Sequence, residues 1–235
     1  DAHSNLGTIL RNLGRAKEAE LSVRKAIDLK PNCTIAHLNL GIILNDLGKL
    51  EGAELSYRKA IQLNPNYAEP HLNLGNILKN LGKLQEAKSS YLKAIELKPD
   101  FADAHLNLGI ILKDLGKLQD AEVSFKKAIQ LDPSLAEAHY SLGIIFKDLK
   151  NLKEAAVSLQ KASELKSNWE ANFLYASLLF DQKKFDCSLD NLKKAKTLVP
   201  QDTLGTIEAA ITAVNLTKNK LIKNNQLDYL QETKK

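Results

Sequence analysis

The sequence HLNLG occurs at residues 37–41, 71–75 and 105–109, and the variants HSNLG and HYSLG occur at residues 3–7 and 139–143. Each copy lies 34 residues from the next, and all five histidines of the chain fall on this motif. Most copies are followed at constant distances by a glycine and then by a proline that closes the unit. The glycines are Gly14, Gly48, Gly82 and Gly116, and the prolines are Pro31, Pro65, Pro99 and Pro133. A fixed period of this length indicates a repeat architecture. The chain is therefore predicted to be a tandem array of one structural unit.

Each repeat is predicted to form two helices. Apolar side chains recur at three- and four-residue spacing over residues 36–47 and again over residues 50–63, which is typical of helices with one apolar face. Gly48 is expected to end the first helix in the left-handed conformation, and Pro65 to end the second. The helices that follow the prolines are expected to be N-capped by Asn32, Asn66, Asp100 and Ser134. The fold class is predicted to be all-α.

The repeat resembles the tetratricopeptide repeat, a 34-residue helix–turn–helix unit. In residues 34–67 the residues that carry the resemblance are Leu40, Gly41, Ala53, Tyr57, Ala60 and Pro65. The repeats are similar to those of bacterial tetratricopeptide proteins and of the tetratricopeptide region of O-linked N-acetylglucosamine transferase. This resemblance implies a right-handed superhelical α-solenoid whose first helices line a concave groove.

The repeat register predicts six repeats in residues 1–202, at about 1–33, 34–67, 68–101, 102–135, 136–168 and 169–202. Residues 203–222 are predicted to form a capping helix, and residues 223–235 a polar tail that frays. The fifth repeat departs from the pattern, since Lys150 stands at the glycine position and Ser167 at the proline position. Asp1 falls at the second position of a repeat, so we expect the chain to be a fragment of a longer array.

Composition argues against several classes of partner. The formal net charge of +5 and the pI of about 9.0 suggest a polyanion, but from Lys218 onward five lysines stand against two acidic residues, so much of the excess lies in the tail. No apolar run approaches eighteen residues. We therefore expect no nucleic-acid partner and no membrane association, and assign a cytoplasmic location. Cys33 and Cys187, in the first and sixth repeats, are too far apart for a disulfide.

No constellation for catalysis or metal binding is found. One histidine per repeat places successive imidazoles on the order of 10 Å apart, whereas zinc ligands converge on one ion. Asp46, Asp114 and Asp148 also recur once per repeat, so they do not form a catalytic dyad. Phosphate-binding, metalloprotease and nucleophile-elbow motifs are absent from the sequence. We expect no enzyme activity and no cofactor.

The candidate site is the groove face of the first helices. Asn5, Asn39, Asn73 and Asn107 each precede the leucine–glycine pair, and the resemblance places this position in the groove, where an amide can hold a peptide backbone. Leu38, Leu72, Leu106 and Tyr140 are predicted to form an apolar row beside them, and Asn76, Lys79 and Lys113 to extend the groove. Two alternatives remain open: the asparagines only solvate a helix, or the leucines are buried between repeats.

These observations lead to one main function and two alternatives. The chain is predicted to be a protein-interaction module that binds an extended peptide or protein segment along its groove. The first alternative is a targeting segment of a larger enzyme, of glycosyltransferase or sulfotransferase type, with its catalytic domain outside this chain. The second is end-to-end self-association through the uncapped first repeat. A carboxylate clamp for acidic C-terminal tails is disfavoured, because Leu72, Glu137 and Ser141 occupy its basic positions.

Overall fold

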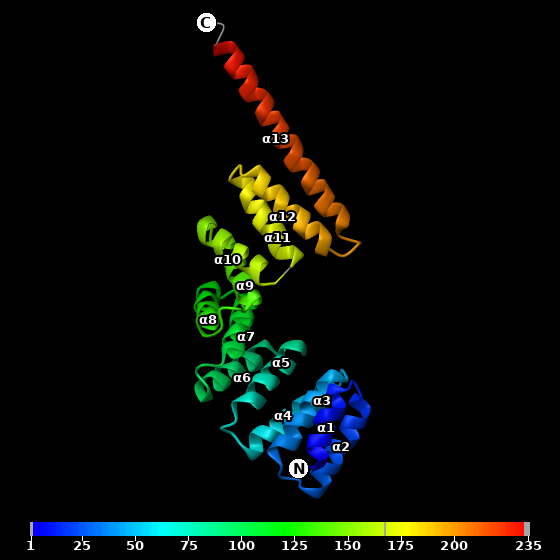
Figure 1. Ribbon diagram of the computed structural model, residues 1–235. Coiled ribbons are helices and arrows are strands. Elements are labelled where there is room, and N and C mark those ends of the chain that lie inside the picture. Colours follow the sequence, from blue (N-terminus) through cyan, green and yellow to red (C-terminus); the bar gives the residue numbers. More distant parts are fainter. Residues whose placement is uncertain (1, 167, 233–235) are drawn as a thin grey trace. The chain divides into compact units, whose positions relative to one another are not determined.

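The structure, a computed structural model, describes residues 2–166 and 168–232, and within them it contains thirteen α-helices and no strand (Figure 1). The helices are α1 (Ala2–Asn12), α2 (Ala16–Leu29), α3 (Thr34–Asp46), α4 (Leu50–Leu63), α5 (Ala68–Asn80), α6 (Leu84–Leu97), α7 (Ala102–Asp114), α8 (Leu118–Leu131), α9 (Ala136–Asp148), α10 (Leu152–Leu165), α11 (Trp169–Asp181), α12 (Phe185–Leu198) and α13 (Leu204–Glu232). The predicted all-α fold is confirmed.

The chain divides into two compact parts, which we call the N-terminal block (residues 1–131) and the C-terminal block (residues 132–235). In the N-terminal block each first helix packs against the second helix of its own repeat, and α2, α4 and α6 also pack against the first helix that follows them. In the C-terminal block α9 pairs with α10 and α11 with α12, while α13 packs against α12. Stacking of this kind buries apolar faces that a single helix pair would expose.

Close packing within a repeat depends on a glycine that faces an aromatic ring. A Cβ atom added at Gly75 would lie 2.5 Å from Cε1 of Tyr91, and the equivalent pair Gly109 and Phe125 gives 2.7 Å. Tyr91 and Phe125 are completely buried. The leucine–glycine motif therefore sets the distance between the two helices of a repeat, because any larger residue would collide with the ring.

Replacing Gly75 with alanine is expected to lower the free energy of unfolding by about 1–3 kcal/mol, the usual cost of overpacking a core. The sixth repeat supplies a natural compensation, since Ala176 and Leu192 stand at the two equivalent positions. The double variant Gly75→Ala/Tyr91→Leu should therefore be more stable than the sum of the two single changes predicts. Urea denaturation of all four proteins, followed by circular dichroism, measures this coupling. Strict additivity would contradict it.

The turns inside the repeats adopt the left-handed conformation that was expected. Gly14, Gly48, Gly82 and Gly116 have φ angles of 71–74°. Lys150 and Lys183 occupy the same position in the fifth and sixth repeats with φ angles of 62° and 59°. A side chain in this region is strained, so both lysines weaken the C-terminal block.

Lys150→Gly is expected to stabilise the C-terminal block by about 1 kcal/mol, because glycine adopts this conformation without a Cβ clash. The chain has one tryptophan, Trp169, and it lies in this block, so its fluorescence reports unfolding there. The matched control is Gly116→Lys, where an added Cβ would meet no atom within 4 Å. This reverse change should destabilise the N-terminal block by a similar amount. Equal free energies of unfolding for wild type and Lys150→Gly would show that the left-handed conformation of Lys150 costs no stability.

The prediction of N-caps at the proline-following residues is wrong. The N-cap residues of α3, α5, α7 and α9 each lie one residue later than predicted, at Cys33, Tyr67, Phe101 and Leu135, and none of them makes a side-chain cap. The turns are stabilised locally instead: Asn64 Oδ1 accepts a hydrogen bond from the Asn66 N–H at 3.2 Å. The equivalent acceptor, Asp132, binds both the N–H and the hydroxyl of Ser134, which lowers the pKa of its carboxyl.

The last helix is longer than expected. Helix α13 runs from Leu204 to Glu232, so the capping helix does not end at residue 222 but continues into the segment predicted to be a polar tail. Residues 233–235 of that tail lie outside the described residues. Near its start α13 buries Ile207 and Val214.

Candidate functional site

The first helices of the N-terminal block form one continuous face. Helices α1, α3, α5 and α7 each contact the next member of this series, whereas the second helices of the block are not in comparable contact with one another. Helices that approach one another more closely on one side place that side on the inside of a curve. The four asparagines, one from each first helix, therefore belong to the inner layer of this block.

Asn39 is tied to the preceding repeat. Its Nδ2 donates hydrogen bonds to Ser4 Oγ at 3.1 Å and to Thr8 Oγ1 at 3.2 Å, so both amide hydrogens are used within the protein. The carbonyl oxygen of the amide makes no such bond. Asn39 therefore offers a ligand only the acceptor Oδ1, whereas the repeat pattern suggested that its amide donors would also be available.

Asn107 takes part in a small network on α5 and α7. Its Nδ2 donates to Asn76 Oδ1 at 3.1 Å, and the same oxygen accepts a hydrogen bond from the Tyr91 hydroxyl at 2.8 Å. Burial raises the pKa of the Tyr91 hydroxyl above its usual value, which keeps the proton on the donor. The network fixes the orientation of the Asn76 amide through its oxygen, and these two hydrogen bonds leave its NH₂ group unused.

Asn73 and Asn5 differ from the other two asparagines. Within the part of the chain that the structure describes, neither side chain has a hydrogen-bond partner, and Asn73 is half-buried while Asn5 is exposed. The cause is the preceding repeat: the positions that Ser4 and Thr8 occupy before Asn39 are Leu38 and Ile42 before Asn73. An apolar neighbour cannot bind the amide, so Asn73 keeps two donors and one acceptor for a ligand.

The predicted apolar row is wrong for the three leucines. Leu38, Leu72 and Leu106 are only 7–8% exposed, and Ser4 at the same repeat position is 3% exposed. This position lies at the junction between adjacent first helices, because Ser4 there accepts a hydrogen bond from Asn39 of the next first helix. The leucines hold the helices together and do not form a contact surface. Tyr140, in the C-terminal block, is half-buried.

The two lysines remain on the surface. Lys79 and Lys113 are partly exposed, and neither forms an ion pair among the described side chains. At the equivalent position of the first repeat, Arg11 is paired with Asp46 of the second. Asn73, Asn76 and Lys79 follow one another at three-residue spacing on α5, which therefore carries a group of hydrogen-bond donors. We call these three residues the α5 patch.

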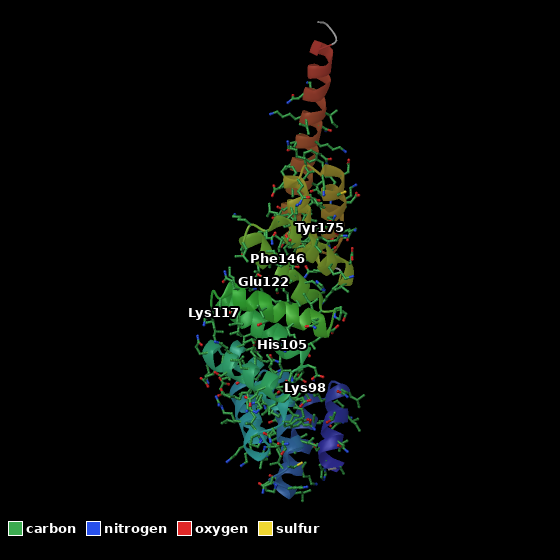
Figure 2. All side chains as sticks on the ribbon, turned by 90° about the vertical axis from the view of Figure 1, so that its left-hand side faces the viewer. Lys98, His105, Lys117, Glu122, Phe146 and Tyr175 are labelled. Carbon is green, nitrogen blue, oxygen red and sulfur yellow. The ribbon has the colours of Figure 1, made fainter. Side chains whose placement is uncertain are left out.

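The histidines have a role that the sequence did not predict in detail. Nε2 of His37, His71, His105 and His139 lies 2.8–3.2 Å from the carbonyl oxygen of Pro31, Pro65, Pro99 and Pro133, respectively. His105 is one of the residues labelled in Figure 2. Each imidazole fastens the turn between two repeats to the following helix. Among the described residues, no three His, Cys, Asp or Glu side chains are grouped as metal ligands.

His139 makes the C-terminal block sensitive to pH. Burial lowers the pKa of His139 below its ordinary value of 6.5; the hydrogen bond to the Pro133 carbonyl opposes this shift, and the charge of Lys161 adds to it. The unfolded chain therefore binds a proton more readily than the folded chain, and stability should fall as the pH drops below about 6.5. His139 is the one histidine of this block. The measurement is the urea midpoint of unfolding, followed by Trp169 fluorescence, at pH 7.5 and at pH 5.5. The difference between the two midpoints should be smaller in His139→Gln than in wild type. An equal difference in the two proteins would contradict the role of His139.

The family is shown by sequence models of the repeat. Models described as "TPR repeat" match residues 43–82 and 75–116, and models described as "Tetratricopeptide repeat" match residues 1–33, 102–135 and 136–168. These matches cover more than half of the chain, and those to residues 1–33, 102–135 and 136–168 each span one helix pair of the structure. The chain belongs to the tetratricopeptide repeat family.

Three solved structures illustrate the similarity of fold. MamA is 27% identical, with a TM-score of 0.63, covering 68% of this chain and 93% of its own. PilF of Pseudomonas aeruginosa is 21% identical with a TM-score of 0.81, covering 89% and 96%. YrrB, described as "a TPR protein with an unusual peptide-binding site", is 23% identical with a TM-score of 0.64, covering 80% and 97%. They establish the solenoid fold.

No curated protein sequence matched the chain. Among the described helices, none combines the length and the apolar character that crossing a membrane requires.

Proposed function

We propose that the chain is a protein-interaction module and that its N-terminal block binds an extended polypeptide across the first helices, centred on the α5 patch. The observation that carries the proposal is the unengaged amide of Asn73 beside the NH₂ group of Asn76 and the ammonium group of Lys79. Three adjacent donor groups suit the carbonyl oxygens of a peptide backbone. No catalytic role is assigned to these residues.

The spacing of the helices fits an extended ligand. Packed helices lie about 8–10 Å apart, and an extended chain rises about 3.3 Å per residue. A peptide that crosses the helices would thus meet an equivalent position about once every three residues. Asn39 Oδ1 on α3, the α5 patch and Asn107 Oδ1 on α7 would contact successive parts of such a peptide. YrrB, with its reported peptide-binding site, indicates that this fold can carry such a function.

The test is selection of a peptide from a displayed 12-residue library, followed by titration of the selected peptide. Asn73→Ala should weaken binding by about fivefold to tenfold, the worth of one or two hydrogen bonds. Gln85→Ala, which removes an exposed amide from the outer helix α6, is the matched control and should leave the dissociation constant unchanged. Equal binding by wild type and Asn73→Ala would overturn the proposed site.

A further inference from the structure

The C-terminal block contains an apolar cavity of about 200 Å³ at the junction of α11, α12 and α13. Its walls include Phe173, Phe180, Leu192, Ala213 and Val214. Leu192 and Val214 are buried, whereas Ala213 is exposed, so the cavity has a closed floor and an open side.

The cavity results from small residues at one junction. Leu192 replaces the tyrosine of the second and third repeats, and α13 presents Ala210 and Ala213 to the space. The helices nevertheless stay in place, because Ser188 donates a hydrogen bond to the carbonyl of Ala176 at 2.8 Å and Val214 packs against Leu192. The space is therefore held open by the fold.

A second hollow adjoins the first and shares Phe180 with it. This hollow, about 390 Å³, is lined by Lys183 and Lys220 as well as by Asp181. Neither lysine has an ion-pair partner among the described side chains, whereas the neighbouring Lys218 is paired with Asp186. The second hollow is lined by two positive charges and one negative charge, so its net positive charge favours an anion beside the apolar cavity.

Two residues that line the cavity stand at repeat positions of the α5 patch. Counted from the start of the sixth repeat, Ser177 and Phe180 stand where Asn76 and Lys79 stand in the third. The same positions are polar in the N-terminal block and border an apolar cavity in the C-terminal block.

We propose that this cavity receives one large apolar side chain of a bound polypeptide, and that Lys183 and Lys220 bind an acidic residue next to it. The inference rests on the proposed function, since it assumes a polypeptide ligand. The size of the cavity favours a side chain: sites for drug-sized molecules measure about 300–1,000 Å³. The edge-to-face contact of Phe180 with Phe185, at 5.7 Å between ring centroids, fixes the wall between the two hollows.

The experiment uses a displayed 12-residue peptide library on four full-length proteins: wild type, Ala213→Leu, Lys183→Gly and Lys150→Gly. Ala213→Leu fills the cavity from an exposed position. Lys183→Gly removes a charge and relieves a left-handed backbone, so a loss of binding cannot come from a loss of stability. Lys150→Gly makes the same change at the equivalent turn of the fifth repeat, away from the cavity, and is the matched control.

Wild type and Lys150→Gly should enrich peptides with Phe, Leu or Trp next to Asp or Glu. A fluorescein-labelled copy of the most enriched peptide should bind about tenfold more weakly to Ala213→Leu and about threefold more weakly to Lys183→Gly. Unchanged binding by Ala213→Leu, or selection of no such peptides, would overturn the proposal. Concentration-dependent dimerisation in light scattering that Ala213→Leu abolishes would also overturn it, because a second copy would then be the occupant.

The same peptide distinguishes this inference from the proposed site on α5. A peptide that requires Asn73 but tolerates Ala213→Leu supports the α5 patch and refutes the cavity. A peptide that is weakened by Ala213→Leu but tolerates Asn73→Ala supports the cavity and refutes the α5 patch.

Discussion

Tyr91→Ala is expected to lower the free energy of unfolding by about 3–5 kcal/mol, which is typical of removing a large buried ring. The ring is completely buried and fills the space that Gly75 leaves beside it. No nearby residue can take its place, because the distance between α5 and α6 is fixed by contacts along both helices. In urea denaturation followed by circular dichroism, Tyr91→Ala should therefore unfold at urea concentrations at which wild type remains folded.

Tyr91→Phe separates the ring from its hydroxyl. This variant keeps the packing and removes only the hydrogen bond to Asn76, so a loss of about 1 kcal/mol is expected. If Tyr91→Phe proved as unstable as Tyr91→Ala, the hydrogen-bond network and not the packing would dominate this position. If both variants matched wild type, the glycine–aromatic contact would have no part in stability.

The second large effect concerns binding. Replacing Asn39, Asn73 and Asn107 together with alanine is expected to weaken a selected peptide by about 2–4 kcal/mol, or roughly thirtyfold to a thousandfold. Asn73 can contribute both donors and its acceptor, whereas Asn39 and Asn107 have amide hydrogens committed to the preceding repeat. The single change Asn73→Ala should therefore weaken binding more than Asn39→Ala or Asn107→Ala does.

Stability provides the control for this triple variant. Alanine favours helix more than asparagine does, but Asn39 and Asn107 also link neighbouring repeats. Thermal unfolding should therefore show a small decrease for Asn39→Ala and for Asn107→Ala, and none for Asn73→Ala. Binding by the folded triple variant at wild-type affinity would show that the asparagines only solvate the helix surface.

The sequence predicts the helices well because their determinants are local. The 34-residue period, the apolar stripes and the left-handed glycines each depend on residues within one repeat, and the structure has the helices and turns that they indicate. The strained conformation of Lys150 was also foreseeable from the position alone. By contrast, the length of α13 was underestimated, because its polar composition after residue 222 resembles a tail as much as a solvated helix.

The site was predicted less well because it depends on distances between repeats. The repeat pattern assigns Leu38 to the groove side of its helix, but only the approach of the neighbouring first helix decides whether it is covered. Likewise, the state of Asn107 depends on Asn76, which lies 31 residues earlier. The cavity beside Val214 arises from small side chains on three helices and has no sequence motif.

The residue three positions after the asparagine of each first helix helps to decide whether the asparagine of the following repeat is engaged. Thr8 engages Asn39 and Asn76 engages Asn107, whereas Ile42 leaves Asn73 unbound. The binding capacity of a repeat is therefore encoded partly in the repeat before it. Duplication or shuffling of whole repeats would change recognition at each new junction even if every inserted repeat kept its own sequence. In such an array the pair of adjacent repeats, and not the single repeat, is the unit on which selection for ligand specificity acts.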